Sequence, residues 1–139
     1  MSTTDRSLRF IGVVRSPLRS RHDAPRQGDE GGPAAWLEID EPYAAALQGL
    51  AVGDAILVLT WLHQADRDVL DVHPRGDRNR ALTGVFATRS PDRPNPIGLH
   101  QVTVLGIGAG SRLEVHPLEA IDGTPIIDIK PVLPRTAER

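Results

Sequence analysis

Closely spaced glycine and proline residues limit this chain to short secondary-structure elements. The 139 residues include 13 glycines and 12 prolines, spread along most of the sequence. Both residue types interrupt helices and mark turns, glycine through its backbone freedom and proline through its fixed φ angle. The sequence therefore predicts a single domain, residues 1–139, built from many short elements joined by turns.

Two apolar segments give the clearest strand signals, and they differ in pattern. Residues 35–39 alternate between apolar and polar side chains, which is typical of a strand with one buried face. Residues 55–62 are continuously apolar, which is typical of a strand buried on both faces. Further short strands are expected at residues 8–15, 69–73, 82–88, 101–105, 112–116 and 125–129.

One short helix is expected between the two clearest strands. Asp40 can cap it, and Pro42 suits its first turn, where a backbone N–H has no helical partner. Gly49 or Gly53 ends it. Its apolar face consists of Tyr43, Leu47 and Leu50. Because the other elements are strands, the predicted fold class is all-β and mostly antiparallel, and a small closed barrel is favoured since closure leaves no exposed sheet edge.

A glycine-rich segment, G-I-G-A-G-S at residues 106–111, superficially resembles a dinucleotide-binding fingerprint. However, Ser111 stands where that fingerprint needs its last glycine, and the alternating residues 112–116 predict a strand rather than a helix. Without a helix N-terminus there is no pyrophosphate site. The segment is therefore predicted to be a hairpin turn.

Residues 83–101, T-G-V-F-A-T-R-S-P-D-R-P-N-P-I-G-L-H-Q, contain an unusually stiff loop. Pro91, Pro94 and Pro96 each fix φ and also restrict the residue before them. Stiffness lowers the entropy that is lost when side chains are held around a ligand. The polar side chains that this loop would hold are Arg89, Ser90, Asp92, Arg93 and Asn95. The alternative is a rigid connector on the surface.

The charge balance does not by itself indicate a nucleic-acid-binding protein, because the formal net charge is −2. Lys130 is the single lysine, so the basic residues are nearly all arginine, which binds carboxylate or phosphate through paired hydrogen bonds. High genomic GC content is an equally good reason for that bias. The arginines that could form a local basic surface are Arg15, Arg19, Arg21, Arg26, Arg75, Arg78 and Arg80.

Several classes of site lack support in the sequence. There is no cysteine, which excludes disulfides, thiolate zinc sites and a cysteine nucleophile. No metal site is expected, because Asp71 and His73 share a strand face without a second ligand pair near His63 or Asp66. No signal peptide or apolar run of about 18 residues is present, so the expected compartment is the cytoplasm, without a membrane partner.

Several short motifs occur in an order that is similar to one known family. They are I-G-V-V-R-S-P at residues 11–17, P-R-Q at 25–27, H-Q at 63–64, G-V-F-A-T-R-S at 84–90, R-P-N-P-I-G at 93–98, D-G-T-P at 122–125 and D-I-K-P at 128–131. The chain resembles the TsaA/TrmO-like (VirR-like) family across most of its length. Characterised members use S-adenosylmethionine to N6-methylate threonylcarbamoyladenosine beside the tRNA anticodon.

The resemblance implies a β-barrel methyltransferase, a homodimer, and S-adenosyl-L-methionine as the cofactor. It implies tRNA as the partner and methyl acceptor. Two alternatives keep the cofactor but replace tRNA by a small-molecule acceptor or replace catalysis by a regulatory, cofactor-binding role. The cofactor-binding residues that the resemblance implies are Arg26, Gln27, His63, Gln64, Arg89, Leu99, Glu119, Ala120, Ile121 and Asp122.

Catalysis in such a family requires alignment of donor and acceptor and removal of a proton. The acceptor nitrogen of threonylcarbamoyladenosine is a poor nucleophile because its lone pair is delocalised, so a base would help. His63, Asp92 and Asp122 are the candidates for that base, and the sequence does not choose among them. Asn95, in the stiff loop, completes the set of candidate catalytic residues.

Overall fold

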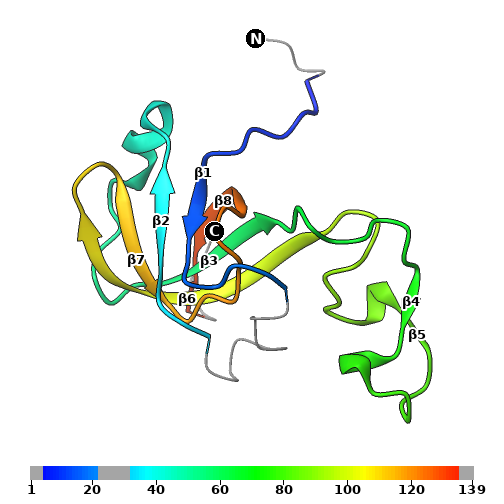
Figure 1. The fold of residues 1–139 in the computed structure, drawn as a ribbon. Helices are drawn as coiled ribbons and strands as arrows, with labels where there is room; N and C mark the ends of the chain where they lie inside the picture. Colours follow the sequence, from blue (N-terminus) through cyan, green and yellow to red (C-terminus); the bar gives the residue numbers. More distant parts are fainter. Residues whose placement is uncertain (1–4, 22–31, 135–139) are drawn as a thin grey trace.

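Six antiparallel strands close into a barrel in the computed structural model, which describes residues 5–21 and 32–134 (Figure 1). The strand order is β1-β2-β7-β6-β3-β8, and β8 pairs with β1 to complete the ring. This confirms the predicted fold class. The barrel strands are β1 (Gly12–Arg15), β2 (Ala35–Ile39), β3 (Ala55–Trp61), β6 (Ile97–Gly108), β7 (Arg112–His116) and β8 (Pro125–Pro131).

A second, smaller unit lies between β3 and β6 in the chain and projects from the barrel (Figure 1). We call this segment, residues 62–96, the lobe. It contains a two-stranded sheet of β4 (Asp71–Val72) and β5 (Thr83–Gly84) and two short 3₁₀ turns, η3 (Pro74–Gly76) and η4 (Val85–Ala87).

The barrel encloses a hydrophobic core, and each of its six strands contributes buried side chains to it. Strand β3 alternates, with Ile56, Val58 and Thr60 buried and the residues between them only half-buried. The expectation that this strand is buried on both faces was therefore wrong. A closed barrel has one packed interior, so a strand in it buries every second residue even when both faces are apolar.

The expected helix is a 3₁₀ helix, η2 (Glu41–Leu47), rather than an α-helix. Asp40 precedes it with an extended backbone and makes no side-chain capping bond. Tyr43, Leu47 and Leu50 pack against the core, as the apolar pattern predicted. Gly49 and Gly53 follow with φ angles of 100° and 96°, which glycine adopts without strain.

Several predicted strands differ from the structure in length or type. The strand expected at residues 69–73 is reduced to β4, and the one expected at residues 125–129 extends to Pro131. The strand expected at residues 8–15 begins only at Gly12, after an exposed segment. The strand expected at residues 82–88 is reduced to β5, because the chain turns at Val85 and forms η4. That turn buries Val85 and leaves Phe86 86% exposed. The sequence pattern of a regular strand does not predict such an exposed phenylalanine.

The glycine-rich segment is the hairpin turn between β6 and β7, as predicted. Gly108 pairs with Arg112, and the connecting residues Gly110 and Ser111 have φ angles of 75° and 61°. Strand β6 is much longer than expected, because it begins at Ile97 inside the proline-rich motif. The motif therefore continues directly into the barrel wall.

Candidate functional site

The segments that carry the predicted site residues meet at one end of the barrel. Neighbouring strands are antiparallel, and the register pairs Val13 with Pro125 and Trp61 with Ile97. Strands β1 and β3 therefore end where β8 and β6 begin. The described residues predicted for the site lie in the segments at this end or at the start of β6, whereas Arg26 and Gln27 lie outside the described residues.

Asp92 joins three of these segments. Its Oδ2 accepts a hydrogen bond from Arg21 Nη2 at 3.0 Å, and its Oδ1 accepts one from the Asp66 backbone N–H at 2.8 Å. Burial raises the pKa of this carboxyl, but the hydrogen bonds from Arg21 and Asp66 outweigh that effect, so its pKa lies below the ordinary value. Arg21 also donates to the Gln64 backbone carbonyl at 3.4 Å.

Arg67 holds the end of the proline-rich loop. Its Nε donates to the Pro94 carbonyl at 2.7 Å, and its Nη2 donates to Asn95 Oδ1 at 3.0 Å. The guanidinium carbon lies 5.1 Å from the centroid of the Trp61 ring, which is a cation–π distance. Sequence reasoning missed Arg67, although it lies only four residues after His63.

Arg93 is engaged within the loop itself. Its Nε donates to the Ser90 carbonyl at 2.8 Å, and its Nη2 donates to the Val85 and Thr88 carbonyls, both at 2.6 Å. The expectation that Arg93 is held for a ligand was therefore wrong, because its guanidinium stabilises the fold of the loop. Arg89, by contrast, is exposed and makes no hydrogen bond or ion pair with the described residues.

His63 and Asp122 differ in how far their polar atoms are already engaged. His63 is exposed and has no hydrogen bond or ion pair within the described part of the chain. Asp122 Oδ1 accepts a hydrogen bond from the Ser16 backbone N–H at 3.0 Å. Its Oδ2 lies 3.8 Å from Arg15 Nη1 and 3.6 Å from Arg19 Nη1. The turn behind Asp122 is closed by Thr124, whose hydroxyl donates to the Ile121 carbonyl at 2.7 Å.

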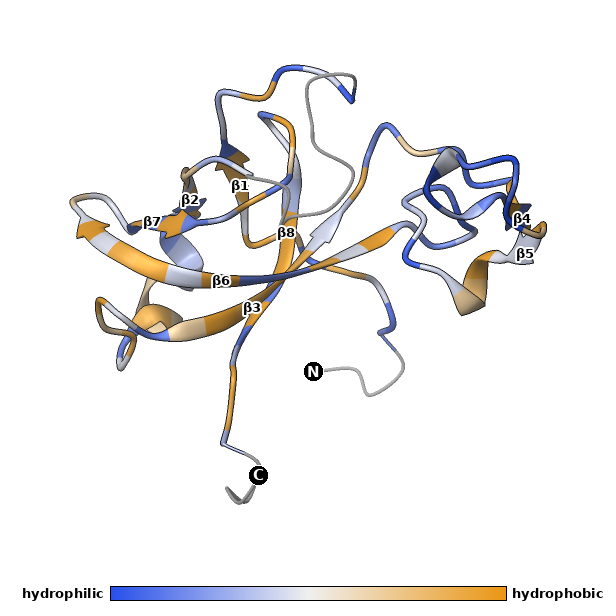
Figure 2. Cartoon of the chain, turned by 90° about the horizontal axis from the view of Figure 1, so that it is seen from below, coloured by the Kyte–Doolittle hydropathy of each residue, from blue (hydrophilic) through white to orange (hydrophobic). Residues whose placement is uncertain are grey.

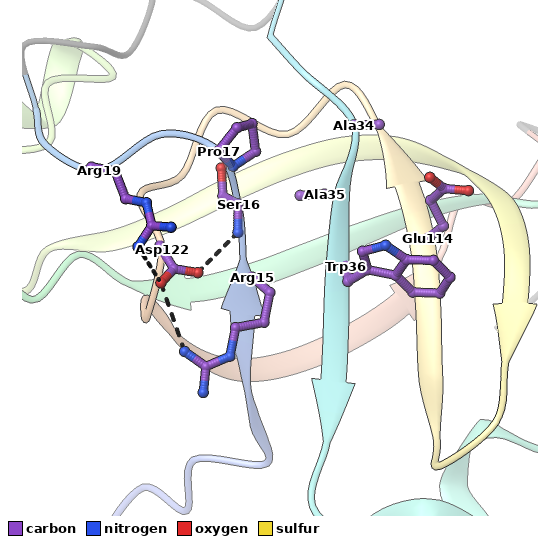
Figure 3. Close-up of a pocket in the computed structure, with 9 residues that line it drawn as sticks. All are labelled: Arg15, Ser16, Pro17, Arg19, Ala34, Ala35, Trp36, Glu114 and Asp122. Atoms are coloured by element: carbon purple, nitrogen blue, oxygen red, sulfur yellow. Dashed lines mark hydrogen bonds and ion pairs between the residues drawn. The ribbon is translucent and has the colours of Figure 1, made fainter.

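An open cleft of about 430 Å³ lies beside Asp122 (Figure 3). Trp36 and Glu114 form the wall that faces Arg15, and Asp122 with Arg19 lies at the other side. The Arg112 guanidinium stacks 4.3 Å from the Trp36 ring centroid and thereby supports this wall. The cleft is lined by Arg15, Ser16, Pro17, Arg19, Ala34, Ala35, Trp36, Glu114 and Asp122.

The predicted cofactor residues do not all line that cleft. Asp122 does, whereas Gln64 and Arg89 belong to the lobe, and Leu99 points outward from β6 with 48% of its surface exposed. Ala120 and Ile121 are buried beside the core, and Glu119 is half-buried. The predicted residues therefore form a band across this end of the barrel rather than one closed pocket.

A histidine that the sequence analysis did not single out lies inside the barrel near this end. His100 Nε2 is 2.8 Å from the hydroxyl oxygen of Thr60, which is fully buried. Burial lowers the pKa of His100 from 6.5 to about 4, so the imidazole is neutral near pH 7. Gly98 leaves room for this pair, since a Cβ there would lie 2.7 Å from His100 Nε2.

Neither a metal site nor a membrane-spanning helix occurs in the described part of the chain. Among residues 5–21 and 32–134, no three histidine, cysteine, aspartate or glutamate side chains gather in a way that could hold a metal ion. The same residues contain no helix long and apolar enough to cross a membrane.

Comparison with family models identifies one match. Residues 13–137 match the model described as the tRNA-methyltransferase O N-terminal domain. This range contains all six barrel strands except the first residue of β1.

Curated relatives are similar over nearly the whole chain. A protein of Methanothermobacter thermautotrophicus, named probable S-adenosyl-L-methionine-binding protein, is 47% identical over 94% of this chain and 93% of the relative. The probable S-adenosyl-L-methionine-binding protein VirR of Rhizobium radiobacter is 45% identical over 91% of this chain and 71% of the relative.

Solved structures show the same fold. A crystal structure of TrmO from Pseudomonas aeruginosa matches with a TM-score of 0.73 and 33% identity, covering 99% of this chain and 59% of that chain. Another structure, titled only as TrmO, matches with a TM-score of 0.72 and 32% identity over 98% of this chain. The chain thus spans about three fifths of the solved TrmO chains.

Proposed function

This chain belongs to the family of the tRNA-methyltransferase O N-terminal domain, and on that premise we propose that it is a methyltransferase that uses S-adenosyl-L-methionine. The observation that carries the proposal is the likeness to TrmO over 99% of the chain, with a TM-score of 0.73. Relatives of nearly the same length are named as binding this cofactor, which supports the choice of methyl donor.

The residues at the site end of the barrel fit the chemistry of this cofactor. Its carboxylate matches the exposed Arg89 guanidinium, and its adenine matches the apolar Leu99 side chain and the backbone groups of the turn before β8. Carboxylates such as Asp92 and Asp122 tolerate a cation nearby. When bound, the cofactor supplies an activated methyl group on a sulfonium centre.

Within this proposal, His63 is the candidate base that the contacts favour. Asp92 already accepts hydrogen bonds at both oxygens and has a lowered pKa. Asp122 accepts a backbone hydrogen bond at one oxygen and has two arginines near the other. Both carboxylates therefore serve better as anchors for the segments, whereas no described residue occupies the ring nitrogens of His63, which leaves them available to accept a proton.

We propose tRNA as the acceptor, at the N6 nitrogen of threonylcarbamoyladenosine beside the anticodon. Membership of the family of the tRNA-methyltransferase O N-terminal domain supports this choice. The experiment is nucleoside mass spectrometry of tRNA after incubation with the protein and a methyl-labelled cofactor. Label in methylated threonylcarbamoyladenosine supports the proposal, and absence of label under conditions where the cofactor binds excludes tRNA as the acceptor.

Binding of tRNA would depend on local arginines, since the net charge of the chain is −2. Each neutralised phosphate contributes about −0.7 to −0.9 to the slope of log affinity against log salt. Replacing Arg78 and Arg80 by alanine is expected to flatten that slope by about one to two units. Affinity for S-adenosylhomocysteine should stay unchanged in this variant, because both side chains are exposed and contact none of the predicted cofactor residues that the structure describes.

The second candidate keeps the cofactor but does not methylate tRNA, acting on a small molecule or as a cofactor-binding regulator. One observation favours it: the relatives at 45–47% identity carry names that mention only cofactor binding. Calorimetry with S-adenosylhomocysteine separates the cases. Heat without methyl transfer to tRNA leaves this second candidate, whereas no heat at millimolar ligand removes both.

We also propose a homodimer, in the cytoplasm. Support comes from the outward face of β6, which exposes four large apolar side chains: Ile97, Leu99, Leu105 and Ile107. These side chains form two apolar pairs, separated by Gln101 and Thr103. Exposed apolar surface is enriched at interfaces, and two-fold dimers are the commonest assembly. Light scattering should give twice the chain mass of 15.1 kDa. Leu105→Lys should shift the protein toward the single-chain mass, and a monomer in the unchanged protein would contradict the proposal.

A further inference from the structure

The contact between Arg67 and Asn95 fixes which way the Asn95 amide points. A guanidinium carries hydrogen-bond donors and no acceptor, so the amide atom that faces it must be the oxygen. Arg67 Nη2 lies 3.0 Å from Asn95 Oδ1. A flipped amide would lose this charge-assisted bond and set two donors face to face. The NH₂ group of Asn95 therefore points away from Arg67.

Neither partner of this contact is free to turn. The Arg67 guanidinium also donates to the Pro94 carbonyl at 2.7 Å and lies against the Trp61 ring, 5.1 Å from its centroid. Asn95 stands between two prolines, which restrict its backbone. The Leu62 backbone N–H donates to the Pro96 carbonyl at 2.8 Å and ties the loop to the end of β3.

The NH₂ group of Asn95 is left as a donor at the surface of the site. The side chain is exposed, and Nδ2 makes no hydrogen bond to any residue that the structure describes. His63 lies next to Leu62, so the donor and the candidate base belong to segments joined by a backbone hydrogen bond. A donor held in one orientation, on a segment joined to the one that carries the candidate base, is suited to a ligand that carries an acceptor oxygen near an N–H.

We propose that Arg67 is a positioning residue that fixes Asn95 as a hydrogen-bond donor, and that Asn95 Nδ2 forms a subsite for the carbonyl oxygen of an amide- or urea-type methyl acceptor. This inference rests on the proposed function and adds the residue pair that would recognise the carbonyl oxygen of the acceptor. When such a nitrogen loses its proton to the base, its electron pair delocalises onto the carbonyl oxygen. A donor aimed at that oxygen stabilises the charge that develops there. A simple amine has no such oxygen and gains nothing from the subsite.

The orientation is tested first, without any ligand, by side-chain amide NMR. The chain has two asparagines, Asn79 and Asn95, so the Asn95 signals are assigned by comparing the protein with Asn95→Asp. Arg67→Met should shift the Asn95 amide nitrogen and carbonyl signals, because the oxygen loses its charged donor. Arg78→Met, an exposed arginine of the same lobe, should leave them in place. Unchanged Asn95 signals in Arg67→Met overturn the positioning role.

The donor subsite is tested by titrating the ¹⁵N-labelled protein, with S-adenosylhomocysteine present, with threonylcarbamoyladenosine nucleoside and with adenosine. The carbamoyl compound should shift the Asn95 NH₂ protons downfield, whereas adenosine, which lacks the carbonyl, should not. Equal shifts with both compounds, or no Asn95 shift while other signals report binding of the carbamoyl compound, overturn the subsite.

Variants connect the subsite to catalysis. Asn95→Asp keeps an oxygen facing Arg67 but removes both donors, so methyl transfer should fall about tenfold or more in kcat. Affinity for S-adenosylhomocysteine and the melting temperature should stay near those of the unchanged protein. Arg67→Met should give a smaller loss, about threefold to tenfold, with Arg67→Lys recovering part of it. Full activity in Asn95→Asp overturns the inference.

Failure of the proposed function looks different from failure of this inference. A protein that transfers no methyl group to any acceptor contradicts the proposed function. In that case the two NMR experiments still decide the orientation and the subsite, because neither depends on turnover. Asn79→Asp is the matched control throughout, since the side chain of Asn79 makes no hydrogen bond with the described residues.

Discussion

The barrel and the lobe are stabilised by different kinds of contact. The barrel interior is a continuous cluster of buried side chains that draws on every barrel strand, and hydrophobic residues mark β3, β6 and β8 in Figure 2. The lobe, residues 62–96, is fully described and has Val85 and Pro96 as its buried side chains. Figure 2 shows it as mostly hydrophilic around β4 and β5.

Hydrogen bonds and ion pairs from charged side chains, rather than apolar packing, stabilise the lobe. Arg93 binds three backbone carbonyls, Arg67 binds Pro94 and Asn95, and Asp92 binds Arg21 and Asp66. His73 Nδ1 lies 2.9 Å from the Arg80 carbonyl and ties β4 to the turn before β5. Most of the candidate catalytic residues are in this polar part, which follows the common division between a packed scaffold and functional loops. The difference between the two regions can be tested by substitution.

The largest effect is expected from a cavity in the barrel. Leu37 is fully buried on β2, so Leu37→Ala should lower the free energy of unfolding by about 2–5 kcal/mol. The matched control is Leu82→Ala in the lobe, where the leucine is 57% exposed and the cost should stay within about 0.5 kcal/mol. Urea unfolding measures both. Similar losses of stability in the two variants would contradict the difference in packing between the barrel and the lobe.

A second expectation concerns pH and the histidine inside the barrel. His100 has a folded-state pKa of about 4 against an ordinary value of 6.5, so the unfolded chain binds the proton more readily. Its contribution to stability is complete above pH 6.5 and is lost as the pH falls toward 4, by up to about 3 kcal/mol. In the lobe, Asp92 has a lowered pKa, so its stabilisation is lost only below its ordinary value of 3.8.

The pH dependence of stability between pH 7 and pH 4 therefore reports on His100 in the barrel rather than on Asp92 in the lobe. His100→Gln should remove most of the slope in this range, and His116→Gln, an exposed histidine, should keep it. Thermal unfolding at a series of pH values provides the measurement. If His100→Gln follows the same curve as the unchanged protein, the buried neutral histidine is not the cause of the slope.

Loss of Arg93 should open the lobe locally while the barrel stays folded. Arg93→Ala leaves three carbonyls without their charged donor, at a cost of about 1–3 kcal/mol for an unsatisfied buried group. Hydrogen exchange should show the amides of Val85 and Thr88, which donate to Leu70 and Val85 carbonyls, losing protection about tenfold or more. Uniform loss of protection across barrel and lobe would show that the two regions unfold as one unit.

The smallest effect on stability is expected at Arg89, the neighbouring arginine of the same loop. Arg89→Ala should change the free energy of unfolding by less than about 0.5 kcal/mol, since the side chain is exposed and unengaged among the described residues. Its affinity for S-adenosylhomocysteine should nevertheless fall about tenfold, measured by calorimetry. A large stability loss with unchanged affinity would mean that Arg89 stabilises the loop rather than the cofactor.

Much of the fold followed from local pattern. The strands at residues 35–39 and 112–116 have the predicted bounds, and the glycine-rich hairpin and the apolar face of η2 were also predicted correctly. The errors at Val85 and in the burial of β3 have one cause. Residues that favour strands by composition take another conformation, or bury only one face, when the surrounding structure requires it.

The candidate site was predictable as a set of segments but not as a set of contacts. Motif order identified His63, Asp92, Asn95 and Asp122, which the barrel brings to one end. It could not reveal that Asp92 binds Arg21, 71 residues away, or that Arg67 binds Asn95, 28 residues away. Sequence spacing carries no information on such pairs, because many arginines could reach a given carboxylate or amide.

The sequence by itself determined the class of fold, the family and the stiff, proline-rich loop, because turn residues, strand periodicity and motif order act over short stretches of chain. Only the tertiary structure decided which polar groups are engaged and which remain available. That outcome depends on the register in which β8 closes onto β1 and on the backbone hydrogen bond from Leu62 to Pro96 that joins the two ends of the lobe. Closure of the barrel turns His100 inward beside Thr60, and folding of the lobe sets Arg67 against Asn95.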